Sequence, residues 1–434
     1  MNYIYFLIFT VFFVVILTIN NFNILSVSIQ SWGLFWAVSL VFLINASGWG
    51  IELRPKTILL IIGSLLFMFL GERFCKKTTL YGGHNVNSLI NDEMLAVKKT
   101  SIMVMFLIGI IVIILDYKHV LDVARGVGYA GGSFVLNYAR KAYLYDNVEN
   151  NIFVAMIQYF VIAFGYVNIA ILIRDVTKNG LRKLKKRYIF GIAPLLLLYV
   201  LSTGRTGFLQ VFMYSISMFL LCLYRRNGVI RINNKKAIGI LYKGILVIGI
   251  LFVLLGMLTG KTQKSSVMQI IGEYFGSGIA ALNTWIEGKY LYASRSSLIG
   301  EETFRSLYQL IARFVNIPMS SSLKEFISFN NGDTTNVYTA FRDYYSDFGM
   351  FGTWMIEFMM GFFLTYLLGK ALKEKNVGIH SMLYAYFSYG ILRQITAAHF
   401  ISSYFNIQYM FVFLFMILIM RYMKFEQEEK EVYR

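Results

Sequence analysis

The stretch that decides the fold runs from residue 182 to residue 226 and reads RKLKKRYIFGIAPLLLLYVLSTGRTGFLQVFMYSISMFLLCLYRR. Two apolar segments, 188–202 and 207–224, lie between a basic loop and a second basic loop, and a short turn joins them. Each segment is close to the roughly 20 residues that a helix needs to cross a bilayer. The stretch therefore predicts a helical hairpin in a membrane, with both basic ends on the same side.

The same alternation of apolar segments and basic loops continues along the chain. Hydrophobic residues make up 57% of the 434 residues and charged residues only 15%, which excludes a soluble globular protein. The sequence predicts an all-α integral membrane protein, a single polytopic domain (1–434) of about eleven spans, with ten to twelve as the range. The expected spans are 3–19, 30–48, 57–72, 101–117, 152–173, 188–202, 207–224, 238–258, 348–369, 379–397 and 403–421.

The basic loops also predict the orientation of the chain. Short loops rich in Lys and Arg stay on the cytoplasmic side of a membrane. With eleven spans the N-terminus faces out, whereas ten or twelve spans would turn it in. We expect the C-terminus to be cytoplasmic together with the loops 174–187, 225–237 and 370–378.

The turn 203–206 and the polar segment 259–343 then lie on the outer side, the second as one large extracytoplasmic loop. This loop contains an amphipathic stretch, 270–282, that is too short to span and is expected to form short helices in the membrane interface. A large ordered loop of this kind is more often functional than not. The alternative is a solvated cap over the helices.

The formal net charge of +18 does not indicate nucleic acid as a partner. The basic residues cluster at the ends of apolar segments, where they set topology and meet anionic lipid head groups. The four histidines lack the paired spacing of a zinc site, and no Asp-x-Asp motif is present to hold a metal for a nucleotide-sugar donor. We expect membrane lipid as a partner, no metal and no cofactor.

Arg205 is the first candidate for chemistry, because it stands in the short turn between two apolar segments. Glycines and hydroxyl side chains surround it at the expected start of the following helix, where backbone N–H groups are exposed. A guanidinium next to a helix N-terminus is typical of phosphate sites. The alternative is an arginine that extends from a tight hairpin to the interface.

A second candidate segment, 336–349, reads NVYTAFRDYYSDFG and leads from the outer loop into the span 348–369. Carboxylates, a guanidinium and tyrosines can bind sugar hydroxyls and stack on sugar rings, and a carboxylate can act as the base that activates a hydroxyl. The alternative is that Arg342 pairs with Asp343 or Asp347 to stabilise the fold. Helical spacing would place Asn336, Asp343 and Asp347 on one face, and Tyr338, Arg342 and Tyr345 on the neighbouring face.

Arg393 lies near the outer end of the span 379–397. It belongs to a polar stripe at helical spacing, and such a stripe should face the interior of the bundle. His399 follows in a short outer loop, where it contributes to the same site or is an interface residue only. Arg305 and Arg313 are interleaved with aromatic residues in the long outer loop.

The order and context of these motifs resemble the Wzy-type oligosaccharide repeat unit polymerases of bacterial O-antigen and capsule assembly. The resemblance covers most of residues 190–370, whereas the first half of the chain matches only in hydropathy. It rests on a Ser-Thr-Gly-Arg turn at 202–205, then Tyr274, Gly276, Gly278 and Asn283 in the long outer loop, then 336–339 and 347–349, which run into a span with Gly352 and Gly361.

The resemblance implies a metal-independent membrane glycosyltransferase on the outer face of the bacterial cytoplasmic membrane. Both substrates would be oligosaccharides on undecaprenyl pyrophosphate: a sugar hydroxyl of one lipid-linked unit attacks the anomeric carbon of the growing chain, which moves as a block. A chain-length co-polymerase is a further partner that the resemblance admits. The expected catalytic residues are Arg205, Asp343 and Asp347, and the expected residues for pyrophosphate or glycan are Arg342, Arg393, Tyr338, Tyr345, Asn336, Arg305, Arg313 and His399.

Two other functions remain open from the sequence. An O-antigen ligase-like glycosyltransferase shares the donor and the topology, so the sequence separates it poorly from a polymerase. A flippase or permease for the lipid-linked oligosaccharide should line a path with polar groups at mid-membrane depth in several helices. The arginines and carboxylates here gather at one face instead, which favours chemistry on the outer side.

Overall fold

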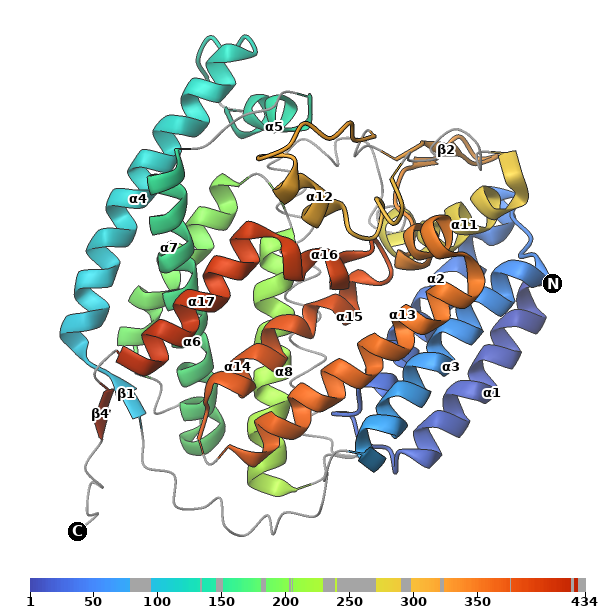
Figure 1. The fold of residues 1–434 in the computed structure, drawn as a ribbon, viewed down its shortest axis with the longest axis horizontal. Coiled ribbons are helices and arrows are strands. Elements are labelled where there is room, and N and C mark those ends of the chain that lie inside the picture. The colour runs from blue at the N-terminus through green and yellow to red at the C-terminus, as the bar shows by residue number, and fades with distance from the viewer. Residues whose placement is uncertain are drawn as a thin grey trace.

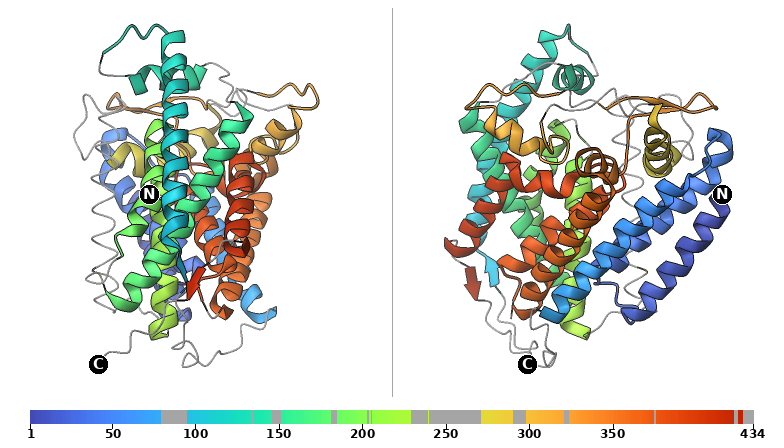
Figure 2. Two further views of the ribbon diagram at one scale, coloured as in Figure 1. Left: turned by 90° about the vertical axis from the view of Figure 1, so that its left-hand side faces the viewer. Right: turned by 45° about the vertical axis from the view of Figure 1, so that its right-hand side comes forward.

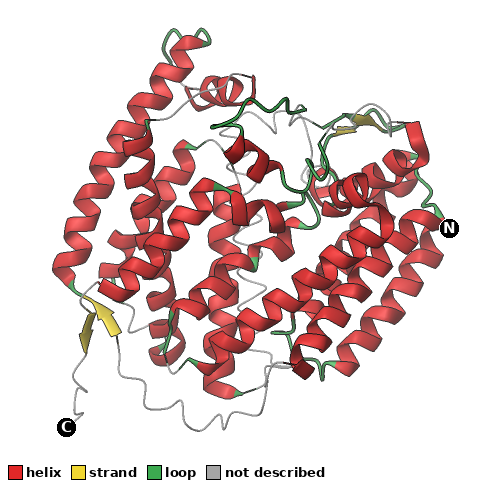
Figure 3. Ribbon diagram, viewed as in Figure 1, coloured by secondary structure: helices red, strands yellow, loops and turns green. Residues whose placement is uncertain are grey.

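The structure of the protein is a computed structural model that describes residues 1–78, 95–132, 135–145, 151–180, 185–202, 204, 206–228, 239, 271–289, 298–320, 324–374, 376–422 and 425–427. Helices dominate this part of the chain (Figure 3). Within it, seven helices are long and apolar enough to cross a membrane, so the protein is an all-α multi-pass membrane protein. They are α1 (Asn2–Ile19), α2 (Val27–Trp49), α3 (Pro55–Thr78), α4 (Lys99–Gly126), α6 (Ile152–Asn179), α8 (Thr206–Asn227) and α13 (Ala340–Lys373).

Two shorter apolar helices, α7 (Arg187–Leu201) and α17 (Ile407–Tyr422), coincide with two more of the expected spans. The expected span 379–397 is divided into α14 (Ile379–Phe387) and α15 (Tyr389–Arg393). The expected span 238–258 lies outside the described residues, apart from residue 239. The count of about eleven spans therefore stays a prediction.

The helices form two groups that Figure 1 shows side by side. One contains α1, α2, α3 and α13, and the other contains α4, α6, α7, α14 and α17. Each group buries its own cluster of apolar side chains. A third apolar cluster, to which α8, α13 and α14 contribute, lies between the two and holds them together.

The short elements gather at the ends of the bundle (Figures 1 and 2). The lower end in Figure 1 carries the antiparallel pair β1 (Leu95–Val97) and β4 (Phe425–Gln427). The elements at the other end, called the upper end from here on, join the membrane helices that enter and leave it. They are α5 (Val135–Tyr145), the π-helical turns η3 (Gly272–Gly276) and η4 (Trp285–Lys289) on either side of α11 (Ser277–Thr284), α12 (Arg305–Ile311), the hairpin of β2 (Ile327–Ser328) and β3 (Thr334–Thr335), and α16 (His399–Phe405).

The stretch expected to lie in the membrane interface is buried among helices instead. Residues 277–283 are all buried, on every face of α11. A Cβ on Gly278 would stand 2.8 Å from the carbonyl oxygen of Ile395, and one on Gly276 would stand 3.1 Å from the backbone nitrogen of Phe42. The small residues allow this close approach, so α11 keeps no free apolar face for the membrane interface, whereas Ile271 before it is exposed.

The closest crossing of two membrane helices joins α3 and α13. A Cβ on Gly361 would stand 2.1 Å from the carbonyl oxygen of Met68, and one on Gly71 would stand 2.0 Å from that of Phe358. Both neighbours are backbone atoms, which cannot move aside as a flexible side chain can. The two glycines therefore fix how closely the helices pack.

Gly361→Ala should lower the stability of the protein by about 1–3 kcal/mol, because the added methyl forces the two backbones apart. The measurement is the thermal unfolding of purified protein in detergent. Gly48→Ala in α2 is the matched control, since nothing lies within 4 Å of the position that its Cβ would take. Equal unfolding temperatures for the two variants would contradict the packing argument.

Candidate functional site

The segment that carries most of the expected site residues is helical over only part of its length. α13 begins at Ala340, so Asn336 and Tyr338 precede it, and its helical geometry is interrupted at Gly349 (φ 66°, ψ −166°). The prediction that Asn336 shares a helical face with Asp343 and Asp347 is therefore wrong. The chain enters α13 through an extended residue, and the N–H of Ala340 donates to the carbonyl of Gln394, the residue after Arg393, at 2.7 Å.

Arg342 is fully buried and lies among carboxylates. Its Nη1 donates to Asp343 Oδ1 at 3.1 Å and lies 3.4 Å from Glu302 Oε2, and its Nη2 donates to Glu325 Oε2 at 2.8 Å. Lys324 forms a further ion pair with Asp343. These five residues are called the Arg342 cluster. A guanidinium paired in this way is already neutralised by carboxylates, which weakens its attraction for a diphosphate.

Aromatic rings flank the Arg342 cluster. The guanidinium carbon of Arg342 lies 5.2 Å from the ring centre of Trp285 and 5.0 Å from that of Tyr338, distances typical of cation–π contacts. The Tyr338 hydroxyl donates to the carbonyl of Glu325 at 3.0 Å. Tyr345, half-buried, meets the Trp285 ring edge-on and has the ammonium of Lys56 5.2 Å from its ring centre. The structure thus brings both expected tyrosines to the cluster.

Asp347 and Arg305 hold the segment 298–320 in place. Asp347 Oδ2 accepts the backbone N–H of Thr303 at 2.7 Å. Arg305 donates to the carbonyl and the hydroxyl of Ser320, both at 3.0 Å, and lies 3.4 Å from Glu301 Oε1. These contacts place the turn before α12 against the start of α13. Contacts of this kind are expected for residues that position a loop.

The remaining expected residues of the outer loop lie apart from these contacts. Arg313 follows α12 and is exposed, and Asn336 is half-buried in the chain before α13. Arg205, the expected catalytic arginine of the short turn, lies outside the described residues. Its neighbour Thr206 begins α8, and the Thr206 carbonyl accepts the hydroxyl of Tyr389 at 3.1 Å.

Arg393 occupies a different environment from Arg342. It is half-buried, and its Nε is buried without a hydrogen-bond partner among the described residues. His399 Nε2 is 2.8 Å from the Tyr409 hydroxyl, which donates to Gln210 Oε1 at 3.1 Å. The single hydroxyl proton of Tyr409 is thus used, so His399 Nε2 carries the hydrogen and donates. Arg393, His399, Tyr389, Tyr409 and Gln210 are called the Arg393 site.

The Arg393 site contains a buried hydrogen-bond donor that lacks an acceptor among the described residues. Burial, and then the charge of Arg393, lower the pKa of His399 in the short helix α16 to about 3, so this imidazole is neutral at pH 7. Arg393 Nε is buried without a partner among the described residues, whereas the Gln210 side chain shares a hydrogen bond with Tyr386. A buried donor without an acceptor is costly, and an anionic oxygen can satisfy this guanidinium.

Gln394 links the two sites to the interior of the bundle. Its side-chain oxygen accepts the hydroxyl of Ser31 in α2 at 2.6 Å, and its side-chain nitrogen donates to Glu357 Oε2 in α13 at 2.5 Å. Glu357 is fully buried, and its other carboxyl oxygen has no partner among the described residues. The position of the chain next to Arg393 therefore depends on this polar network.

Gln394→Ala should destabilise the protein by about 2 kcal/mol, since it leaves the buried Glu357 without its donor. Thermal unfolding in detergent measures the effect. Gln394→Glu with Glu357→Gln, which exchanges the two groups, is the control and should recover most of the loss. A Gln394→Ala variant as stable as the unchanged protein would contradict this role for the network.

Several site residues were not expected from the sequence. Glu302 and Glu325 stand in the outer loop, and the adjacent acidic pair at 301–302 was the available signal for the first of them. Gln210 and Tyr409 each stand in an apolar span, and a polar residue there signals a function or a buried network. Trp285 gave no signal that separates it from an ordinary core residue.

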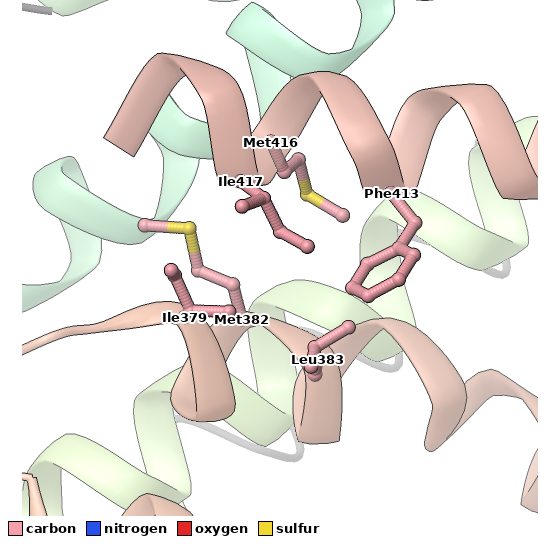
Figure 4. Close-up of a pocket in the computed structure, with 6 residues that line it drawn as sticks. All are labelled: Ile379, Met382, Leu383, Phe413, Met416 and Ile417. Atoms are coloured by element: carbon pink, nitrogen blue, oxygen red, sulfur yellow. The ribbon is translucent and has the colours of Figure 1, made fainter. Parts of the chain in front are cut away.

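A recess between α14 and α17 differs from both sites in its chemistry. Figure 4 shows its lining, in which all six side chains are apolar: Ile379, Met382, Leu383, Phe413, Met416 and Ile417. Such a lining offers no group for a charged or hydroxylated ligand. Among the described residues, no three His, Cys, Asp or Glu side chains are arranged to hold a metal ion.

Comparisons with known protein families, with curated proteins and with solved structures find no match for this chain. The two arginines differ in their partners: Arg342 lies within 3.4 Å of three carboxylates, whereas Arg393 forms no ion pair within the described part of the chain and its charge acts on the neutral His399.

Proposed function

We propose that the protein is a polysaccharide repeat unit polymerase of a bacterial cytoplasmic membrane. It joins oligosaccharides carried on undecaprenyl pyrophosphate by transferring the growing chain as a block to a sugar hydroxyl of the next unit. The leaving group of this reaction is a membrane-bound diphosphate. The enzyme therefore needs a positive charge and several hydrogen-bond donors near the membrane rim.

The observation that carries the proposal is the guanidinium of Arg393. Its Nε is buried without a hydrogen-bond partner among the described residues, no carboxylate of that part of the chain pairs with it, and His399 is neutral. An arginine kept without a carboxylate costs stability, and such a cost is characteristic of functional sites. Diphosphate oxygens would supply the missing acceptors and neutralise the guanidinium.

The Arg342 cluster supports the acceptor side of the same reaction. The hydrogen bond from Ala340 to the carbonyl of Gln394 joins the start of α13 to the chain next to Arg393. Carboxylates with aromatic rings beside them suit a sugar, whose hydroxyls bind carboxylates and whose ring stacks on aromatic faces. The donor diphosphate and the acceptor glycan would then occupy neighbouring parts of the upper end.

The distribution of basic residues supports an upper end that faces out. Basic residues cluster on the cytoplasmic side of membrane proteins. Of the helices that run toward the lower end, α3, α6, α8, α13 and α17 carry basic residues in the last turn, whereas α1 carries none (Figure 1). These basic residues are Lys76, Lys77, Lys178, Arg225, Arg226, Lys370, Lys373 and Arg421.

The test is the reaction itself, with purified protein in detergent and a lipid-linked repeat unit as the substrate. We expect products that are longer by whole repeat units, together with release of undecaprenyl pyrophosphate. A ligase would lengthen nothing in the absence of its own acceptor, and a flippase would leave the substrate unchanged. A deletion strain that displays surface glycan of single-repeat length would support the same conclusion in the cell.

A further inference from the structure

The two carboxylates expected to activate the acceptor, those of Asp343 and Asp347, both form ion pairs or hydrogen bonds with other groups of the protein. Asp343 is held by Lys324 and by Arg342. Asp347 accepts the backbone N–H of Thr303. A carboxylate whose lone pairs are committed to cations or to N–H groups has fewer of them left to accept the proton of a ligand hydroxyl. Both aspartates therefore suit orientation of the segment better than removal of a proton.

The carboxylate of Glu302 forms fewer contacts than the carboxylates of the two aspartates. Its Oε2 lies 3.4 Å from Arg342 Nη1, and its side chain accepts no hydrogen bond from the residues that the structure describes. The side chain is 7% exposed, so it is mostly shielded from water. Its carboxylate thus keeps lone pairs available for a ligand hydroxyl next to the aromatic rings of the Arg342 cluster.

The electrostatic environment raises the basicity of Glu302. Burial, and then the negative charge of Asp343, raise the pKa of Glu302 above its ordinary value, while Arg342, Lys324 and Arg305 act in the opposite direction. A carboxylate with a raised pKa accepts a proton more readily than an ordinary one. What favours Glu302 over the two aspartates is its position next to the aromatic rings and a carboxylate that accepts no hydrogen bond from the described residues.

A second, independent feature at this place indicates a hydroxylated ligand. Trp285 is 2% exposed, and its Nε1–H is buried without an acceptor among the described residues. The same indole ring lies against the guanidinium of Arg342. A sugar hydroxyl next to the ring would accept this N–H and satisfy a donor that the fold leaves unpaired.

We propose that Glu302 is the base that accepts the proton of the attacking sugar hydroxyl, an inference that rests on the proposed function. The acceptor oxygen forms its bond to the anomeric carbon as its proton passes to a carboxylate oxygen of Glu302. The bond from the anomeric carbon to the diphosphate oxygen breaks, and its electron pair leaves with undecaprenyl pyrophosphate. Asp343 and Asp347 orient the segment on which the acceptor lies.

The test compares Glu302→Gln with the unchanged protein in the lengthening assay. A general base contributes roughly 10²–10⁴-fold to a rate, so we expect the turnover of Glu302→Gln to fall by about 100-fold or more, with a small change in KM. Formate should restore part of the activity of Glu302→Gly, because it supplies a carboxylate at the vacated place. Glu287→Gln, which changes a more exposed glutamate at the same end, is the control and should keep full turnover.

Lys324→Met provides a readout that a merely structural glutamate would not give. The ammonium of Lys324 lowers the pKa of Glu302, so its removal should move the acidic limb of the pH–rate profile to higher pH. Full turnover of Glu302→Gln, or a Lys324→Met profile with an unmoved limb, would overturn the assignment of Glu302 and leave the polymerase intact. Failure of the unchanged protein to lengthen the substrate would overturn the polymerase, and the assignment with it.

Discussion

Arg393→Ala should reduce lengthening of lipid-linked oligosaccharide by about 100-fold without loss of stability. Removal of one preorganised donor to a developing negative charge typically costs 10²–10³-fold in turnover. Arg393 Nε has no partner among the described residues, so its removal breaks no hydrogen bond of this atom within that part of the chain. The burial cost of an unpaired cation disappears at the same time, and the unfolding temperature should be unchanged or higher.

Two further variants separate charge from geometry at this position. Arg393→Lys keeps the charge but loses the planar fork that binds two phosphate oxygens, so intermediate activity is expected. Arg125→Ala removes an arginine from the upper end of α4, where it forms a surface ion pair with Asp122, and should leave activity unchanged. Arg393→Ala protein that is both stable and fully active would exclude Arg393 from the site.

Arg342→Met, unlike Arg393→Ala, should cause a large loss of stability. The guanidinium of Arg342 is buried and faces the carboxylates of Asp343, Glu302 and Glu325. Removal of one partner from a buried ion pair typically costs 3–5 kcal/mol, because the remaining charges stay buried without compensation. The expected result is a marked drop in folded protein on size-exclusion chromatography in detergent.

The surface pair of Arg54 and Glu287 provides the matched control for this variant. Its nitrogen–oxygen distance is 2.8 Å, but the Arg54 side chain is 66% exposed, so the pair should contribute about 0–1 kcal/mol. Arg54→Met should therefore fold normally. Arg342→Met combined with Glu325→Gln should recover part of the lost stability, because it removes one of the uncompensated charges. Normal folding of Arg342→Met alone would contradict the structural role of the Arg342 cluster.

The sequence predicts the positions of several membrane helices closely, but it does not predict a break within an apolar run. The expected span 3–19 appears as α1, and 207–224 appears within α8. The expected span 379–397 is broken between α14 and α15. A run of apolar residues predicts that a segment is buried in a membrane, but a break within such a run depends on the packing of neighbouring helices.

The residue types of the candidate site could be predicted from the sequence, but the roles of the individual residues could not. The arginines at 342 and 393 stand out in the sequence in the same way, each as a cation next to an apolar span. The residues that lie near each arginine distinguish Arg342 from Arg393. Glu302 and Glu325 come to Arg342 from a distant part of the outer loop, whereas Tyr409 and Gln210 come to the Arg393 site from other helices.

The sequence by itself determined that this protein lies in a membrane, where many of its helices run and which ends of them are basic. Hydropathy and loop charge are local properties, and the bilayer selects on them segment by segment. Only the tertiary structure decided which arginine is neutralised by carboxylates and which has no carboxylate partner among the described residues. The balance of charge at a buried group depends on residues far apart in the chain, and folding alone brings them within a few ångströms of each other.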